Sequence, residues 1–214
     1  HLGVRRQRQM CIRDRDYLMD IDFIFDVASP NAYLSHKAVP HFEKKHNVTF
    51  NYIPCLLGGI FKITNNTAPM VANAEIPKKL DYMFREMKRF SERHKITTLK
   101  HNPFFPINTV TMQRASLFAQ ENGFYKKYVD VALKGMWEDE INMGDQEILR
   151  DYLNANDLDG DALIEAAGEQ RIKDLLFSNT QNAVDRGAFG VPTFFIDDEL
   201  FFGKEAFNEM PDYL

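Results

Sequence analysis

Ser29 stands at the junction where the residue types of this sequence best suit chemistry. It follows a β-rich run over residues 20–27 and precedes a helical pattern that opens with Pro30. A residue between a strand and a helix lies at the helix N-terminus, where unpaired backbone N–H groups and the helix dipole favour an anion. Two interpretations remain open: Ser29 is an ordinary N-cap, or it stabilises an anionic reactant.

The same junction carries a reactive Cys-x-x-Cys pair in thioredoxin-like folds. Here the two cysteine positions hold Ser29 and Ala32, so the junction has no dithiol. We therefore expect any thiol that reacts there to come from another molecule. The missing dithiol also argues against a disulfide oxidoreductase.

A second signal is the segment Gly190-Val191-Pro192-Thr193, which stands directly before a β-rich run. In thioredoxin-like folds an X-Pro bond at this place is cis and presents the backbone of X to a bound thiol peptide. A proline that merely begins a strand is the simpler alternative. Together with Ser29-Pro30, the segment favours a thiol-binding site.

Two polar segments supply candidate ligand contacts. Lys62 and Asn66 follow the second strand, where they could bind a carboxylate and a peptide group, or be a solvated loop lysine and a turn asparagine. Glu205, next to Lys204, opens a short helix after the last strand. Its carboxylate could hold a ligand ammonium group, or simply complement the helix dipole.

Composition narrows the partners. The net charge is −5 and no basic stripe occurs, which argues against nucleic acid. No apolar run approaches the roughly 20 residues that span a membrane. The histidines show no metal-ligand spacing, so we expect no metal. Cys55, the one cysteine after residue 18, is expected to be buried and unpaired. Because the sequence thus gives no sign of a disulfide, we expect a cytoplasmic protein.

The patterning predicts an α/β protein. A strand (20–27), a helix (30–46, with a kink or early end at Pro40) and a strand (48–53) form a parallel βαβ unit. Helices are then predicted over 78–94, 109–122, 124–139, 146–153, 159–165 and 169–186, followed by strands at 192–196 and 199–202 and a short helix over 204–210. This order is that of a thioredoxin-like fold (βαβ…ββα) with a large all-helical insertion. We expect a thioredoxin-like domain over 19–60 and 187–214, and an insertion domain over 61–186.

Residues 1–18 differ from the rest of the chain. They hold five arginines but no apolar stretch of the kind that a secretory signal needs. We expect them to be a non-native or disordered leader, with the native chain beginning at Met19.

Four segments together resemble the 2-hydroxychromene-2-carboxylate isomerases and the related kappa-class glutathione transferases, in the DsbA-like branch of the thioredoxin superfamily. They are Phe25–Tyr33, Pro54–Lys62, Phe104–Thr109 with Arg114, and Gly187–Thr193. One segment departs from the family pattern: Phe202-Gly203-Lys204-Glu205-Ala206 stands where the family has Phe-Trp-Gly, a polar residue and Asp-Arg. The resemblance covers residues 20–207.

The resemblance implies an enzyme that uses glutathione as its cofactor, with Ser29 facing the glutathione sulfur. It implies glutathione contacts at Lys62, Asn66, Val191, Pro192, Lys204 and Glu205. The implied activity is isomerisation of a conjugated, aromatic-derived carboxylate by a homodimer. Aromatic residues such as Tyr33, Phe61 and Phe104 are expected to line the pocket of this small-molecule substrate. A kappa-type transferase or peroxidase and a non-enzymatic DsbA-like binding protein are the alternatives.

Overall fold

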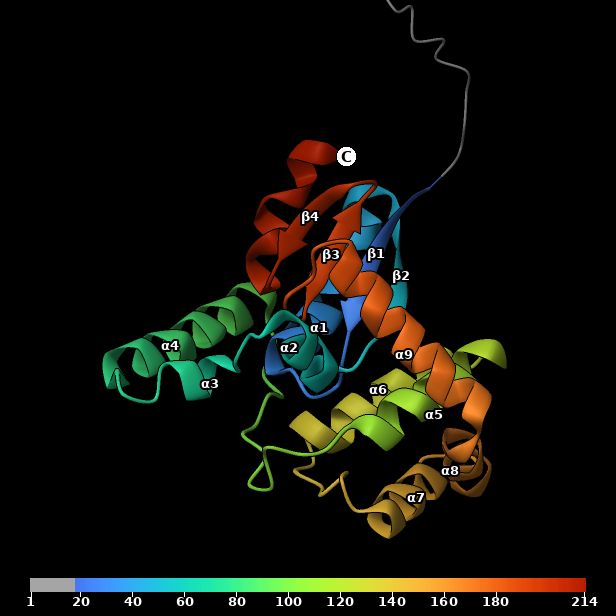
Figure 1. Cartoon of the computed structure of the whole chain (residues 1–214). Helices are drawn as coiled ribbons and strands as arrows, with labels where there is room; N and C mark the ends of the chain where they lie inside the picture. The colour runs from blue at the N-terminus through green and yellow to red at the C-terminus, as the bar shows by residue number, and fades with distance from the viewer. Residues whose placement is uncertain (1–17) are drawn as a thin grey trace, which may run out of the picture.

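The computed structural model describes residues 18–214, so the expected leader lies outside the described residues except for Leu18. A four-stranded sheet has the order β2-β1-β3-β4 (Figure 1). Strands β1 (Met19–Phe25) and β2 (Val48–Pro54) are parallel, with Phe25 opposite Pro54. Strand β3 (Thr193–Ile196) runs antiparallel to both β1 and β4 (Glu199–Phe202). The two ends of the described chain therefore build one sheet.

Helix α1 (Pro30–His46) connects β1 to β2 and has the predicted bounds. Ser29 caps its start, and Asn47 in the left-handed conformation ends it after a basic last turn. Of the two expected effects of Pro40, a kink or an early end, the early end does not occur, since α1 continues to His46. Val39 and Phe42 on either side of it are buried in the core, and this packing outweighs the lost backbone hydrogen bond.

Eight helices lie between β2 and β3, two more than the six predicted, and no strand interrupts residues 61–186, as the expected all-helical insertion requires. They are α2 (Leu57–Thr64), α3 (Pro69–Ala72), α4 (Pro77–His94), α5 (Val110–Glu121), α6 (Tyr125–Trp137), α7 (Gln146–Ala155), α8 (Gly160–Gly168) and α9 (Gln170–Asp185). Figure 1 shows α3 and α4 extending to one side of the molecule, with α5 to α8 gathered beneath the sheet. The predicted short final helix is instead two 3-10 helices, Lys204–Asn208 and Met210–Tyr213.

Helix α2 was not among the predicted helices, and a loop lysine was one of the two interpretations given for Lys62. Gly58 and Gly59 lower helix propensity, which favours the loop interpretation. The structure uses Gly59 for a close approach, because a Cβ atom there would lie 3.1 Å from Thr180 Cγ2 of α9. Packing against α9 therefore stabilises a helix that the local sequence does not favour.

Two side chains of the helical region hold the end of β1 in place. The buried amide of Gln113 in α5 donates to the backbone oxygens of Phe25 (2.8 Å) and Cys55 (2.9 Å). The indole nitrogen of Trp137 in α6 donates to Val27 O at 2.9 Å. The turn that follows β1 is thus fixed by residues far along the chain. Within residues 18–214, none of the helices combines the length and the apolar character needed to cross a bilayer.

Candidate active site

Ser29 lies where β1 turns into α1, and its hydroxyl is bonded on two sides. The oxygen accepts a hydrogen bond from Ala32 N (3.2 Å), as an N-cap does, and the hydroxyl donates to Val191 O at 3.1 Å. Only 5% of the residue is exposed. The single hydroxyl proton is therefore directed at the Val191 carbonyl, and the lone pairs face the helix N-terminus.

The partner of Ser29 belongs to a turn that is itself held rigidly. The Val191–Pro192 peptide is cis, as predicted. Thr193 Oγ1 donates to Gly190 O at 2.8 Å, and Gly203 N donates to Pro192 O at 2.9 Å. These bonds fix the cis turn between β3 and the end of β4, against the start of α1.

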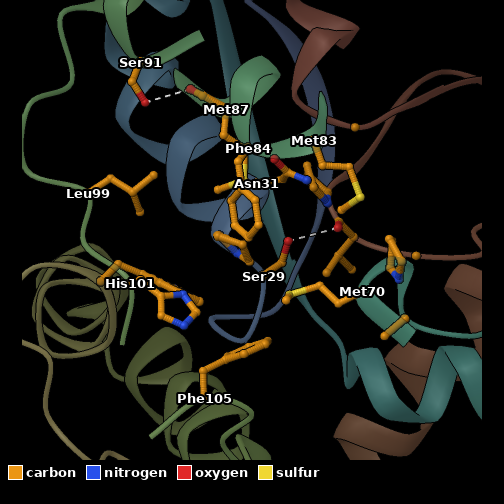
Figure 2. Close-up of a pocket in the computed structure, with 18 of the residues that line it drawn as sticks. Ser29, Asn31, Met70, Met83, Phe84, Met87, Ser91, Leu99, His101 and Phe105 are labelled. Atoms are coloured by element: carbon orange, nitrogen blue, oxygen red, sulfur yellow. Dashed lines mark hydrogen bonds between the residues drawn. The ribbon is translucent and has the colours of Figure 1, made fainter. Parts of the chain in front are cut away.

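A cavity of about 530 Å³ opens beside this contact (Figure 2). Its wall near the cis turn includes Ser29, Phe61, Asn66, Phe189, Gly190, Val191, Pro192, Phe202 and Gly203. The opposite wall is mostly apolar and includes Leu80, Met83, Phe84, Met87, Ile96, Leu99, Phe105 and Trp137. The cavity therefore joins a hydrogen-bonding end at Ser29 to an apolar end under α4.

Four of the seven predicted site residues lie together on this cavity: Ser29, Asn66, Val191 and Pro192. The amide nitrogen of Asn66 donates to Phe189 O at 2.8 Å, which ties the end of α2 to the cis turn.

The other three predicted residues are not part of the cavity wall. Lys62 is exposed on α2. Lys204 is buried with its ammonium nitrogen 5.9 Å from the ring centre of Phe90 and 3.5 Å from Glu205 Oε1. Glu205 also lies 3.5 Å from Arg93 and accepts a hydrogen bond from Asn208 at 2.7 Å. The two charges at 204 and 205 thus bind neighbouring side chains in the described structure.

Asp26 is a buried acid behind Ser29 that the sequence analysis did not single out. Its carboxylate accepts hydrogen bonds from Ala28 N (2.9 Å) and Leu57 N (2.8 Å), and Ser29 N donates to its backbone oxygen at 3.2 Å. Burial raises the pKa of Asp26 to about 6, against the opposing effect of these backbone hydrogen bonds. Asp26 thereby holds the Ser29 turn and the start of α2 in one arrangement. An acid at the end of an apolar strand, just before a candidate site, was the available signal.

Of the aromatic residues expected to line the pocket, Phe61 does so. Tyr33 is fully buried, and its hydroxyl lies 2.6 Å from Thr98 Oγ1 and 3.0 Å from Glu138, behind the wall. Phe104 is half exposed and its neighbour Phe105 takes the place in the wall. The apolar end contributed by α4 was missed. Leu80, Met83, Phe84 and Met87 recur at the three- and four-residue spacing of one helix face, and this stripe was the signal that could have revealed it.

Comparison with known proteins defines the class. A family model described as DSBA-like thioredoxin domain matches residues 20–214, so the chain belongs to that family, and its fold is thioredoxin-like with a large helical insertion. The 2-hydroxychromene-2-carboxylate isomerase of Sphingobium xenophagum is 28% identical over 200 residues, which cover 91% of this chain and 97% of that protein. Glutathione S-transferase kappa 1 of Caenorhabditis elegans is 27% identical over 210 residues, which cover 91% of this chain and 90% of that protein.

Solved structures agree with this fold. A 2-hydroxychromene-2-carboxylate isomerase superposes with a TM-score of 0.76 at 23% identity, over 91% of this chain and 94% of that one. A probable DsbA oxidoreductase from Streptomyces coelicolor superposes with a TM-score of 0.64 at 17% identity, over 92% of this chain and 88% of that one. At these sequence identities the two structural similarities are evidence for the fold alone.

Proposed function

We propose that this protein is a glutathione-dependent isomerase of the 2-hydroxychromene-2-carboxylate isomerase type. The observation that carries the proposal is the position of the Ser29 hydroxyl, between the α1 N-terminus and the cis Val191–Pro192 turn, at the edge of a cavity with an apolar end. The two relatives named above are an isomerase and a glutathione transferase, which supports an enzyme of this type.

The residues at the cis turn suit the sulfur end of glutathione. Ser29 supplies a hydroxyl, the helix start supplies positive potential, and Val191 supplies backbone groups for a bound peptide. At the two ends of glutathione, binding depends on movement of the protein side chains that are expected to contact it. Lys62 and Glu205 would reach a bound glutathione only after changing orientation, and Lys204 would act through its ion pair with Glu205.

Bound glutathione would supply a thiolate that adds to a conjugated carbon of the substrate and leaves after rotation about the new single bond. Ser29 prepares the site for this negative charge by exchanging hydrogen bonds. With glutathione bound, its proton would turn from Val191 O toward the sulfur, while its oxygen would keep the bond from Ala32 N. The released Val191 carbonyl can then accept an N–H group of the peptide. The helix dipole contributes up to about 2 kcal/mol, or roughly one and a half pKa units.

The apolar end of the cavity supports an aromatic or conjugated second substrate. Met83, Phe84 and Met87 of α4 form much of this wall, and methionine and phenylalanine suit flat apolar rings. Lys88 and Lys100 also line the cavity and supply positive charge for a substrate carboxylate. Both lysines have acidic neighbours, Glu92 at 3.8 Å and Glu140 at 3.4 Å, so the carboxylate would compete with these pairs.

Calorimetric titration with glutathione, followed by assay with 2-hydroxychromene-2-carboxylate, tests the proposal. We expect binding, and a product of unchanged mass that forms only when glutathione is present. A Ser29→Ala variant should keep the fold and lose most of this turnover. Full glutathione-dependent turnover in Ser29→Ala would contradict the role of Ser29.

The same assay separates the two alternatives. The kappa-type transferase relative supports conjugation as the second candidate, and this activity would give a product heavier by one glutathione. A protein that shows neither calorimetric heat nor thermal stabilisation with millimolar glutathione would instead favour a non-enzymatic binding protein. We also propose that the protein acts in the cytoplasm and that it is a homodimer. Light scattering coupled to gel filtration tests the oligomeric state.

A further inference from the structure

Strand β2 forms one edge of the sheet, so half of its backbone groups face away from the other strands (Figure 1). The N–H of Cys55, directly after β2, donates to Phe25 O of β1 at 2.9 Å. Because the backbone groups of alternate residues in a strand point to opposite sides, Phe50 and Tyr52 direct theirs away from β1.

Two side chains occupy part of this outward edge. Glu43 of α1 accepts a hydrogen bond from Phe50 N at 3.0 Å, and Gln120 of α5 donates to Tyr52 O at 2.9 Å. The two outward groups between them, Phe50 O and Tyr52 N, form no hydrogen bond to another part of the described chain. One acceptor and one donor thus remain open, with a capped group on either side.

A second cavity, of about 370 Å³, lies at this gap. Its wall includes Phe50 and Tyr52 together with the capping residues Glu43 and Gln120, and it shares no residue with the wall of the Ser29 cavity. Pockets for small ligands measure about 300–1,000 Å³, so this cavity can hold one.

The cavity carries opposite charges at its two ends. Glu43, through its bond to Phe50 N, marks the Phe50 end. Lys126, in the first turn of α6, lines the wall at the Tyr52 end, because the ring of its neighbour Tyr125 packs on Tyr52 with ring centres 5.6 Å apart.

Both charged groups have capacity for a ligand. The bond to the strand uses Oε1 of Glu43, and Oε2 has no partner among residues 18–214. Lys126 donates to Asp130 at 3.0 Å, but an ammonium group has three N–H donors. The Lys126 side chain is also 76% exposed, so it can turn toward the cavity.

The open backbone groups define the direction of a bound main chain. In parallel pairing, one ligand residue donates its N–H to Phe50 O and accepts from Tyr52 N. This pairing brings the ligand nitrogen to Glu43 and its carboxyl group to Lys126. An antiparallel ligand would also reach both backbone groups, but it would place like charges together at each end. The capping side chains leave room for a single residue.

We propose that this cavity binds one free α-amino acid. Its ammonium group lies at Phe50 O and Glu43, and its carboxylate lies at Tyr52 N and Lys126. The side chain of an extended L-residue then lies on the same sheet face as Asn51, which is exposed, so the site recognises the main chain rather than a particular side chain.

Titration of the isotope-labelled wild-type protein with L-alanine, followed by NMR without glutathione, tests this proposal. We expect the backbone amide signal of Tyr52 to shift and to saturate at millimolar alanine. L-Alaninamide and N-acetyl-L-alanine each lack one charge of the amino acid. Each should bind at least about tenfold more weakly, the factor that loss of one hydrogen bond to a charged group supplies.

Variants locate the two charges. Glu43→Gln keeps an acceptor for the strand but removes the negative charge, and Lys126→Gln removes the positive charge; each should weaken alanine binding about tenfold. Lys127→Gln is the matched control, because Lys127 bonds to Asp157 O and does not line the cavity. Ser29→Ala, in the other cavity, should also bind alanine as the wild type does.

Two results on the wild type alone would overturn the proposal: an unchanged Tyr52 signal, or equal affinity for alanine and N-acetyl-L-alanine. A loss of affinity in Ser29→Ala as large as that in Glu43→Gln would place alanine in the other cavity and overturn it too. A protein that binds alanine at Tyr52 but does not bind glutathione would keep this site and lose the proposed isomerase function.

Discussion

The hydroxyl of Ser29 donates a hydrogen bond to the backbone oxygen of Val191 at 3.1 Å, across 162 residues of sequence. One partner begins α1, and the other precedes the cis proline that leads into β3. Because β1 and β3 are neighbours in the sheet, this contact forms where the two ends of the described chain meet. The candidate site is therefore built by strand pairing rather than by any local segment.

Replacing Ser29 by alanine should lower the stability of the free protein. The variant loses the N-cap bond to Ala32 and leaves the Val191 carbonyl without its donor, and loss of an N-cap typically costs about 1 kcal/mol. Ser35→Ala is the matched control, because the Ser35 hydroxyl oxygen has no partner among the described residues. Urea unfolding should show a lower free energy of unfolding for Ser29→Ala and an equal or higher one for Ser35→Ala. Equal losses in both would contradict the capping role of Ser29.

Asp26 should make the stability fall as the pH rises from about 4 to about 6. Burial raises its pKa to about 6, whereas the unfolded chain has a value near 3.8. Between these values the folded protein holds a proton that the unfolded chain has released, so each rise in pH favours unfolding. A shift of about two pKa units corresponds to a change on the order of 3 kcal/mol.

Asp26→Asn isolates this effect from the other titrating groups. The free energy of unfolding, measured by urea denaturation from pH 4 to pH 7, should fall less in the variant than in the wild type. The difference between the two proteins should therefore change by a few kcal/mol over that range. Two parallel curves would mean that Asp26 titrates near its ordinary pKa.

Substitution of Gln113 should lower the free energy of unfolding more than substitution of most other polar residues in the core. Gln113→Leu keeps most of the side-chain volume, but it leaves Cys55 O without its donor (2.9 Å) and Val27 N without its acceptor (3.4 Å), whereas Phe25 O keeps the bond from Cys55 N (2.9 Å). An unsatisfied buried group costs about 1–3 kcal/mol, so we expect a loss of about 3 kcal/mol in unfolding free energy. Gln120→Leu on the same helix is the control, since its bond to Tyr52 O is solvent-exposed and should matter much less. Similar losses of unfolding free energy in Gln113→Leu and Gln120→Leu would show that burial of the Gln113 amide does not increase its contribution to stability.

Cys55 should be chemically inert in the folded protein. Burial raises the pKa of its thiol, and the nearby Asp26 adds to the effect. The thiol also donates to Asn179 O at 3.4 Å. We expect iodoacetamide to leave Cys55 unmodified in native protein and to alkylate it in urea, as peptide mass spectrometry would reveal. Rapid alkylation of the native protein would contradict the buried position of the thiol.

Local signals account for the elements that were predicted correctly. Helix α1 begins at Pro30 and ends before Asn47 as predicted, because a proline in the first turn and a left-handed asparagine at the end act within one turn of the chain. The alternation of strand β2 is likewise visible in its own residues. Helix α2 was missed because its stability comes from the contact of Gly59 with α9, which no local pattern contains.

The amino-acid sequence by itself determined the order of the four strands, the helix between the first two, the long helical region before the last two, and the places of Ser29 and Pro192. These depend on residue type and on neighbours along the chain. Only the tertiary structure decided what surrounds Ser29: the buried Asp26 and the apolar wall from α4. It also placed Lys204 beside Phe90 rather than on the cavity wall. Burial and hydrogen-bond satisfaction depend on segments distant in sequence, so they become defined only when those segments pack together.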